Sequence, residues 1–517
     1  MVFQDDEGLW HNYYLQFNGI VGHIVSSDLA HWETKPAIDF RVSGTWCERG
    51  ECLTGSIFKW NGLWHYAVGS AVDHRPVYGF FTSEDLYHWK LRDKEPVIVS
   101  DGVIYDDSFT GIQGGLNVAF RDPYFRFDEE GNIHAYLCAT KHGRSHRDTR
   151  AVVAHYISSD TVHWKALEPI ADVGKYIRQA ECPSVFPLNG KWYCTFLDHC
   201  WGGLRWDSSG RTDTAGTYYM VSDHPDGPYR FTKSPLLLGA GGNQQESWAG
   251  RVVMVNGEPY IYSHMTNPTG IASFKRIVQT EDGGLKCVYD YSLELLKKEE
   301  PRILTEVCHE EKTEIYVDLG EWESTEKEIT GEAEIMGTAA LLSRDEKDFI
   351  LTMKAGLIYG RSFGIAIRAN NFPGKSWLNL PGFPTPDQRR AIVIRLDYKE
   401  QKAEIAYLER ADMEGYGIAQ RNVVSGGEER LTDSVGMKLE YGKEYGIRVI
   451  TRGPYTELYV NDDLLISKSM RIDNSGDVEL VAECGKAFFR DIRIAAIEEL
   501  EVSEAIPPEY TYYEGGN

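Results

Sequence analysis

The stretch DEEGNIHAYLC (residues 128–138) sets a pattern that occurs five times before residue 264. A polar turn with a glycine is followed by alternating aromatic and β-branched residues. This pattern predicts a tight β-hairpin, because glycine adopts positive φ at little cost and the alternation gives each strand one buried face. The other four copies are DDEGLWHNYYL (5–15), WNGLWHYAV (60–68), LNGKWYCTF (188–196) and VNGEPYIYS (255–263).

A second phrase follows each of the first three hairpins: SSDLAHW (26–32), SEDLYHW (83–89) and SSDTVHW (158–164). Looser versions follow the last two hairpins, at SDHPDGPYRF (222–231) and QTEDGGLK (279–286). Five copies of a four-strand unit, at a period of about 55–70 residues, predict a five-bladed β-propeller over residues 1–290. We expect the repeated His-Trp pairs to pack between blades.

The hairpin pattern ends near Tyr291, where YSLELLKKEEP predicts a short helix or linker over residues 291–312. Short alternating strands without the repeat follow over residues 313–497 and predict a β-sandwich. The acidic, tyrosine-rich tail, residues 498–517, is expected to be a surface strap or disordered. The expected fold class is therefore all-β, with a five-bladed propeller followed by a sandwich.

The amino-acid composition limits the kinds of partner expected for this protein. The net charge of −24 argues against nucleic acid or an anionic membrane, because either needs a basic face, whereas solubility explains the charge. No run reaches the roughly 18 apolar residues of a membrane span. Thirteen Trp and thirty Tyr favour a carbohydrate partner. Nine cysteines without metal-type spacing indicate reduced, buried thiols, and no signal peptide precedes the first strand pattern, so a cytoplasmic protein is expected.

Candidate catalytic carboxylates come from the repeat itself. In each copy the innermost strand of the blade precedes the hairpin glycine and lines the central channel. Counting back twelve residues from a shared hairpin landmark finds Asp122 in the third copy and Glu181 in the fourth. The same count finds Leu53, next to Thr54, in the second copy and Trp248 in the fifth. Two carboxylates on neighbouring blades suit acid/base chemistry on a glycosidic bond.

Arg121 stands beside Asp122, and we expect its charge to lower the pKa of that carboxyl, while a less solvated Glu181 keeps its proton to higher pH. The alternative interpretation is that both carboxylates make turn contacts at strand ends. Trp201 and Trp248, near the expected mouth of the channel, either stack on a sugar or pack in the core.

Three blocks of this sequence resemble motifs of glycoside hydrolase family 32, which contains invertases, fructanases and fructosyltransferases. They are AFRDPYF (119–125), AECPSVFPL (180–188) and GHIVSSDLAHWETKP (22–36). LTGSIF (53–58) resembles a further motif of that family, and TELYVNDDLLISKSM (456–470) more weakly resembles a stretch of its second domain. The resemblance covers residues 1–290 well and extends to about residue 495.

The resemblance implies a retaining enzyme for β-fructofuranosides, such as sucrose, fructo-oligosaccharides or fructans, that needs no cofactor. Glu181 would be the general acid/base and Asp122 the transition-state stabiliser. Arg121 would help grip the sugar, and Cys182 would tune the adjacent acid. Thr54, Trp201 and Trp248 complete the expected substrate-binding set.

The nucleophile is a departure from the family pattern. The family carries it on the first strand of the first blade, and the twelve-residue count from His11 falls two places before Met1. We therefore expect the nucleophile upstream of this sequence and the chain as given to be inactive. Asp5 and Asp6 lie too near the hairpin glycine to replace it. A non-catalytic glycan-binding propeller and a furanosidase for another sugar, such as arabinose, remain alternatives.

No metal is expected, because no acidic or cysteine ligand stands at zinc-like spacing from His142 and His146. The Asp198-His199-Cys200 run is interpreted as structural, since adjacent strand residues point to opposite faces. The sandwich domain is expected to support the propeller and to offer contacts for a homodimer.

Overall fold

The computed structural model describes most of the chain, and its strands fall into two compact units. The described residues up to Ser292 form the first unit and those from Leu293 onward form the second. The described ranges are 1–15, 20–48, 55–72, 75–107, 119–144, 150–174, 177, 179–198, 216–239, 248–266, 269–306, 316–341, 347–372, 388–409, 428–470 and 475–499.

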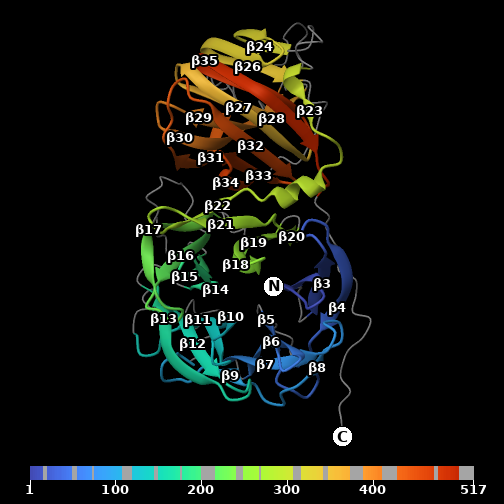
Figure 1. The fold of residues 1–517 in the computed structure, drawn as a ribbon, viewed down its shortest axis with the longest axis vertical. Helices are drawn as coiled ribbons and strands as arrows, with labels where there is room; N and C mark the ends of the chain where they lie inside the picture. Colours follow the sequence, from blue (N-terminus) through green and yellow to red (C-terminus); the bar gives the residue numbers. More distant parts are fainter. Residues whose placement is uncertain are drawn as a thin grey trace, which may run out of the picture. The chain divides into compact units, whose positions relative to one another are not determined.

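The first unit is built from antiparallel sheets of consecutive strands, four of which form a propeller-like arrangement (Figure 1). The first sheet contains β1 (Val2–Gln4), β2 (Trp10–Leu15), β3 (Ile20–Ser26) and β4 (Glu33–Asp39). The second contains β5 (Ser56–Trp60), β6 (Leu63–Val72), β7 (Arg75–Ser83), β8 (Lys90–Leu91) and β9 (Ile98–Val99). The third contains β10 (Phe120–Phe127), β11 (Ile133–Thr140), β12 (Ala151–Ser158) and β13 (Lys165–Asp172), and the fourth contains β14 (Glu181–Leu188), β15 (Lys191–Asp198), β16 (Gly216–Ser222) and β17 (Arg230–Gly239).

A fifth series of strands completes the first unit. β18 pairs with β19, β19 pairs with both β20 and β21, and β21 pairs with β22, all antiparallel. The strands are β18 (Trp248–Val255), β19 (Glu258–Thr266), β20 (Thr269–Ile271), β21 (Lys275–Gln279) and β22 (Leu285–Val288).

The hairpins form where the sequence predicts them, but they are of two kinds. Asn189-Gly190 forms a two-residue turn with φ of 47° and 75°, the left-handed pair that matches strand twist. The third sheet instead uses a five-residue loop in which Asp128 accepts a 2.7 Å hydrogen bond from the Asn132 N–H. The first sheet has the same loop, closed by Asp5. Loop length therefore differs between copies by three residues.

The second repeated phrase is a self-capped turn. In SEDLYHW the Ser83 hydroxyl accepts the Leu86 N–H at 2.9 Å, and Asp85 accepts the N–H groups of Tyr87 and His88 at 2.9 and 2.8 Å. Trp89 is buried in the hydrophobic core, as expected. The expectation that the histidines pack between blades is wrong, because each one is exposed and donates its Nδ1–H to the aspartate of its own turn.

Replacing Asp85 tests this turn. We expect Asp85→Ala to lower the free energy of unfolding by about 1–2 kcal/mol, because the backbone N–H groups lose their acceptor. Glu84→Ala, one residue away and exposed, is the control and should stay within about 0.5 kcal/mol of the parent. Urea denaturation measures both, and equal losses for the two variants would contradict the capping role.

At the boundary predicted to hold a helix or linker lies η4, a short 3-10 helix (Tyr291–Leu296), and apart from a helical stretch at residues 304–306 the described elements of the second unit that follow it are strands. Two long strands, β26 and β35, pair along most of their lengths. Its strands are β23 (Arg302–Ile303), β24 (Tyr316–Leu319), β25 (Glu321–Ser324), β26 (Glu328–Leu341), β27 (Phe349–Tyr359), β28 (Ser362–Phe372), β29 (Gln388–Asp397), β30 (Lys402–Glu409), β31 (Glu428–Gly436), β32 (Tyr445–Arg452), β33 (Tyr455–Val460), β34 (Asp463–Ser469) and β35 (Asp477–Ala496).

Strand β35 divides this sheet into two branches. Its first half pairs with β28, which leads to β29, β30 and β31, and its second half pairs with β27, which leads to β32, β33 and β34. At the division Cys484 has φ of 46°, and a Cβ on Gly485 would lie 2.1 Å from the Tyr359 carbonyl oxygen, so only glycine fits. Both branches contribute to one hydrophobic core, with Ile394 and Ile405 from one and Ile447 from the other.

Two further observations concern whole-chain properties. The six cysteines that the structure describes are free thiols, and five are buried as expected, whereas Cys484 is exposed. Among the described residues, no helix has the length and apolar character needed to cross a bilayer. The proposed tail lies almost wholly outside the described residues.

Candidate functional site

The candidate site lies where β10 and β14 begin, in neighbouring sheets of the first unit. Near the start of each strand an acidic or cysteine residue precedes a proline, in Asp122-Pro123 and Cys182-Pro183. Proline cannot donate to a ladder, and the pairing register shifts at this point in both strands. Asp122 and Cys182 have φ of 62° and 50°. These are β-bulges with a non-glycine residue in the left-handed region, a strained arrangement that is concentrated at functional sites.

The bulges correct the register that the repeat count assigned. Asp122 is the left-handed residue in β10, and its counterpart in β14 is Cys182, not Glu181. Glu181 corresponds instead to Arg121, because each lies at the last ladder pair before its bulge. The count is one residue out because both the hairpin loop and the strand segment before it differ in length: the third copy has four ladder residues and a five-residue loop, and the fourth has five and two.

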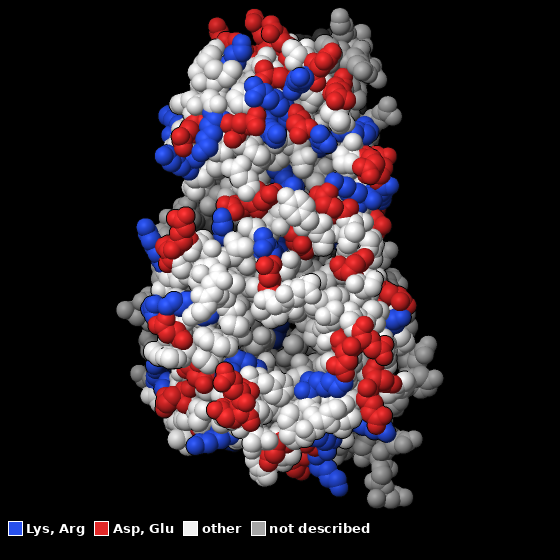
Figure 2. Space-filling view, in the orientation of Figure 1, with Lys and Arg blue, Asp and Glu red and all other residues white. Residues whose placement is uncertain are grey.

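Arg121 nevertheless joins the two carboxyl groups. Its Nη2 atom donates to Glu181 Oε1 and to Gln179 Oε1, and its Nε atom lies 3.7 Å from Asp122 Oδ2. The side chains of Asp122 and Glu181 are 4% and 10% exposed, so this ion pair bridges two sheets in a largely desolvated place. The face drawn in Figure 2 is hollowed near the centre of the first unit.

Asp122 is held by backbone and side-chain groups of other blades. Its Oδ2 atom accepts the Cys182 N–H at 3.0 Å, and its own N–H donates to the Tyr78 hydroxyl at 3.0 Å. Burial raises the pKa of Asp122 above its ordinary value; Arg121 opposes this effect and Glu181 adds to it. Arg121 therefore lowers this pKa as expected, but desolvation outweighs its charge and the net pKa is raised.

Cys182 takes part in the site through its backbone N–H and not through its thiol. The side chain is buried, and burial raises the pKa of the thiol well above its ordinary value, so it stays protonated at neutral pH. Its N–H is the group that fixes Asp122.

Arg251 is a neighbour that sequence reasoning missed. It lies two residues after Ala249, the left-handed bulge residue of β18, and is 4% exposed. Its Nη1 atom donates to the Pro123 carbonyl oxygen at 3.4 Å, while its Nε and Nη2 atoms have no hydrogen-bond partner among the described residues. The signal that could have identified Arg251 was an arginine that follows the same bulge position in a third strand.

Other expected site residues are placed differently. Thr54 and Trp201 lie outside the described residues. Trp248 begins β18 at the ladder position of Arg121 and Glu181, and its side chain also lies outside the described part. Asp5 accepts the N–H groups of Glu7 and Leu9 in the first hairpin loop, so it serves the turn.

Residues 3–246 match the family described as the glycosyl hydrolases family 32 N-terminal domain. This part of the chain belongs to glycoside hydrolase family 32. The family membership agrees with the resemblance carried by the RDP and ECP blocks, which are the two strand starts described above. It makes the first unit a glycoside hydrolase domain.

Solved structures of the same family share the fold. The sucrose-6-phosphate hydrolase from Lactobacillus gasseri has a TM-score of 0.63 at 15% identity, over 96% of this chain and 90% of that one. A β-fructofuranosidase of Bombyx mori has a TM-score of 0.61 at 14% identity, over 96% and 90%. The exo-inulinase from Aspergillus awamori has a TM-score of 0.59 at 14% identity, over 96% and 95%. No protein with a curated description matches the sequence.

The raised pKa of Asp122 gives a stability prediction for this family 32 site. The folded state binds the Asp122 proton more tightly than the unfolded chain, whose carboxyl titrates near 3.8, so the wild-type chain loses stability as pH rises from about 4 through the raised value. Asp122→Asn has no such charge and can still accept the Cys182 N–H.

We therefore expect the free energy of unfolding of Asp122→Asn, relative to wild type, to increase between pH 4 and pH 7. Denaturant unfolding of both proteins across this range measures it. A difference that stays constant or decreases with pH would show that the buried carboxylate is not disfavoured.

Proposed function

We propose that the first unit is the catalytic domain of a retaining glycoside hydrolase or transferase that acts on β-fructofuranosides, such as sucrose, fructo-oligosaccharides or fructans. The observation that carries the proposal is the Arg121 bridge between Asp122 and Glu181 at the starts of two adjacent inner strands. The family membership supports the reaction class, and the named activities of the similar structures support a fructoside as substrate.

Glu181 is proposed as the general acid/base. In the free protein its carboxylate is paired with Arg121. A bound sugar hydroxyl that accepts the Arg121 hydrogen bond would remove the positive partner of the Glu181 carboxylate. In a desolvated environment this loss favours the protonated carboxylic acid, which is the form that can protonate a leaving group. Asp122 is proposed to accept furanose hydroxyls and to stabilise positive charge at the ring carbon, since its position is fixed by the Cys182 N–H.

The architecture is proposed to be a five-bladed propeller over residues 1–290 and a sandwich over residues 313–497, joined by residues 291–312. The antiparallel series from β18 to β22 supports a fifth blade, and the shared core of the two β35 branches supports the sandwich. We propose that the second unit supports the first and offers contacts for a homodimer.

The competing function is a non-catalytic glycan-binding propeller. It is favoured by the state of Asp5 and Asp6, the first carboxylates of the chain. Asp5 caps its hairpin and Asp6 pairs with Lys59, so neither is available as a nucleophile. The coding DNA upstream of Met1 separates the two functions. Family 32 enzymes carry their nucleophile in an Asn-Asp-Pro run, so an in-frame run of this type would support the enzyme, and its absence would support the binder.

Substitution of the two carboxylates tests the enzyme directly. In a chain carrying its encoded upstream residues, we expect Glu181→Gln to reduce kcat for sucrose by about 10²–10⁴-fold, the usual contribution of a general acid/base. Asp122→Asn should reduce it by about 10²–10³-fold, since charge stabilisation at the ring carbon is lost. Release of fructose is measured.

The control is Glu168→Gln, an exposed carboxylate of the third sheet that pairs with Lys141, which should leave turnover unchanged. Near-normal turnover by Glu181→Gln or Asp122→Asn would remove the assignment. Release of arabinose but not fructose from a panel of furanosides would move the substrate to another sugar, while binding of fructo-oligosaccharides without any release would establish the glycan-binding alternative.

A further inference from the structure

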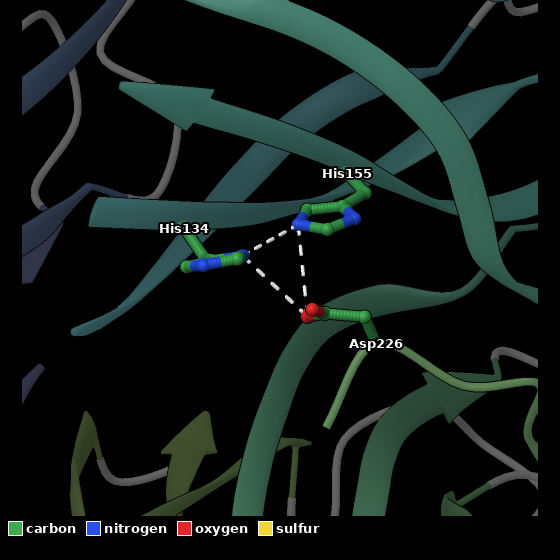
Figure 3. Close-up of side chains that lie close together, drawn as sticks. All are labelled: His134, His155 and Asp226. Carbon is green, nitrogen blue, oxygen red and sulfur yellow. Dashed lines mark hydrogen bonds and ion pairs between the residues drawn. The ribbon is translucent and has the colours of Figure 1, made fainter. Parts of the chain in front are cut away.

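A second cluster of ionisable side chains lies in the first unit away from the carboxylate pair. His134 of β11 and His155 of β12 face each other, and Asp226, from the turn between β16 and β17, faces both (Figure 3). His134 Nδ1 lies 2.7 Å from His155 Nε2, and these two atoms lie 3.5 and 3.7 Å from Asp226 Oδ1. Both histidines are buried, while the Asp226 side chain is 42% exposed and opens the cluster to solvent.

The proton positions follow from a fourth residue. His134 Nε2 lies 3.2 Å from Asp128 Oδ2, so it carries the ring proton and donates to that carboxylate. His134 Nδ1 therefore presents a lone pair to the cluster. That lone pair accepts the His155 Nε2–H at 2.7 Å, and a cation bound at this place would take over both nitrogen atoms.

The first sheet contains the same histidine pair without the third group. His11 Nδ1 lies 2.9 Å from His23 Nε2, and His11 Nε2 lies 3.2 Å from Asp5 Oδ2. The residue that covers this pair is Tyr87, with ring centroids 6.0 Å from His11 and 5.2 Å from His23.

Tyr87 is the fifth residue of its turn, SEDLY, and Asp226 is the fifth residue of the corresponding turn, SDHPD. The first pair is satisfied by one hydrogen bond beneath an aromatic ring. In the third sheet a carboxylate takes the place of that ring. Of the two histidine pairs, only the one in the third sheet therefore has a third possible metal ligand.

The three ligand atoms lie close enough together to share one metal ion. A point equidistant from His134 Nδ1, His155 Nε2 and Asp226 Oδ1 lies about 2.0 Å from each atom, which is close to the Zn–N and Zn–O bond lengths of about 2.0–2.2 Å. Asp128 on the far nitrogen of His134 is the outer-shell carboxylate typical of metal-bound histidine. Tyr136 Oη and Arg126 Nη2, at 2.7 and 3.2 Å, hold the Asp226 carboxylate in place.

We propose that His134, His155 and Asp226 bind a divalent ion of the zinc class, with water as a fourth ligand. Two neutral imidazoles and a carboxylate are donors that suit such an ion. The ion would link the β11–β12 pair of the third sheet to the β16–β17 turn of the fourth. His134 pairs with Arg126, four residues along β10 from Asp122, which is about 13 Å of strand. The site is therefore structural and independent of the proposed hydrolase.

Zinc titration of the full chain tests the site. Protein stripped with EDTA and dialysed is titrated with ZnCl₂ by calorimetry, and bound zinc is counted by atomic emission. We expect one zinc per chain and a higher melting temperature with zinc. Asp226→Asn and His155→Gln should each weaken zinc binding by more than about 100-fold, and Asp128→Asn by about 10–100-fold, the usual range for an outer-shell partner.

His23→Gln in the first sheet is the matched control, because it removes the equivalent member of the other histidine pair and should leave zinc affinity unchanged. Asp226→Asn keeps an oxygen acceptor for Tyr136 and Arg126, and melting without zinc checks that it folds. Absence of zinc uptake by the wild-type chain would overturn the proposal. Equal zinc affinity of wild type and Asp226→Asn, or an equal loss with His23→Gln, would overturn it as well.

Discussion

The hydrogen bond from the Cys182 N–H to the Asp122 carboxylate joins two neighbouring sheets at the place where their inner strands begin. It can form only because both residues adopt positive φ at a bulge, which turns an N–H and a carboxylate out of their ladders toward each other. The adjacent residues, Arg121 and Glu181, then make a second link between the same strands. The geometry of the candidate site follows from these two links.

The candidate site holds charged groups in a desolvated environment, which disfavours their charged forms. Asp122 has a raised pKa, and the buried guanidinium of Arg251 has two nitrogen atoms without a partner among the described residues. Such groups lower stability unless a ligand supplies the missing partners. A polyhydroxylated sugar offers both donors and acceptors, so the unfilled hydrogen-bonding capacity of Asp122, Arg121 and Arg251 is consistent with a polar substrate.

The repeats show how one scaffold carries different chemistry. The first and third sheets share a hairpin aspartate and a histidine pair, with almost the same distances. The residue that covers the pair is an aromatic ring in one case and a carboxylate in the other. Likewise, the position before the bulge is Arg121 in β10, Glu181 in β14 and Trp248 in β18. Backbone geometry is retained between repeats, and function depends on the side chains placed on it.

The sequence by itself determined the all-β class, the hairpins, the phrase that forms the capped turns and the two candidate catalytic carboxylates. These features depend on local periodicity and on residues with restricted φ, both of which can be read along the chain. Only the tertiary structure decided that Glu181 corresponds to Arg121 and not to Asp122. It also decided that desolvation raises the pKa of Asp122 more than the Arg121 charge lowers it. The positions of Arg251 beside the carboxylate pair and of Asp226 beside the histidine pair were decided in the same way. Each of these depends on loop length, burial or the meeting of separate sheets, and the free energy of such contacts is set by neighbours that are distant in the sequence.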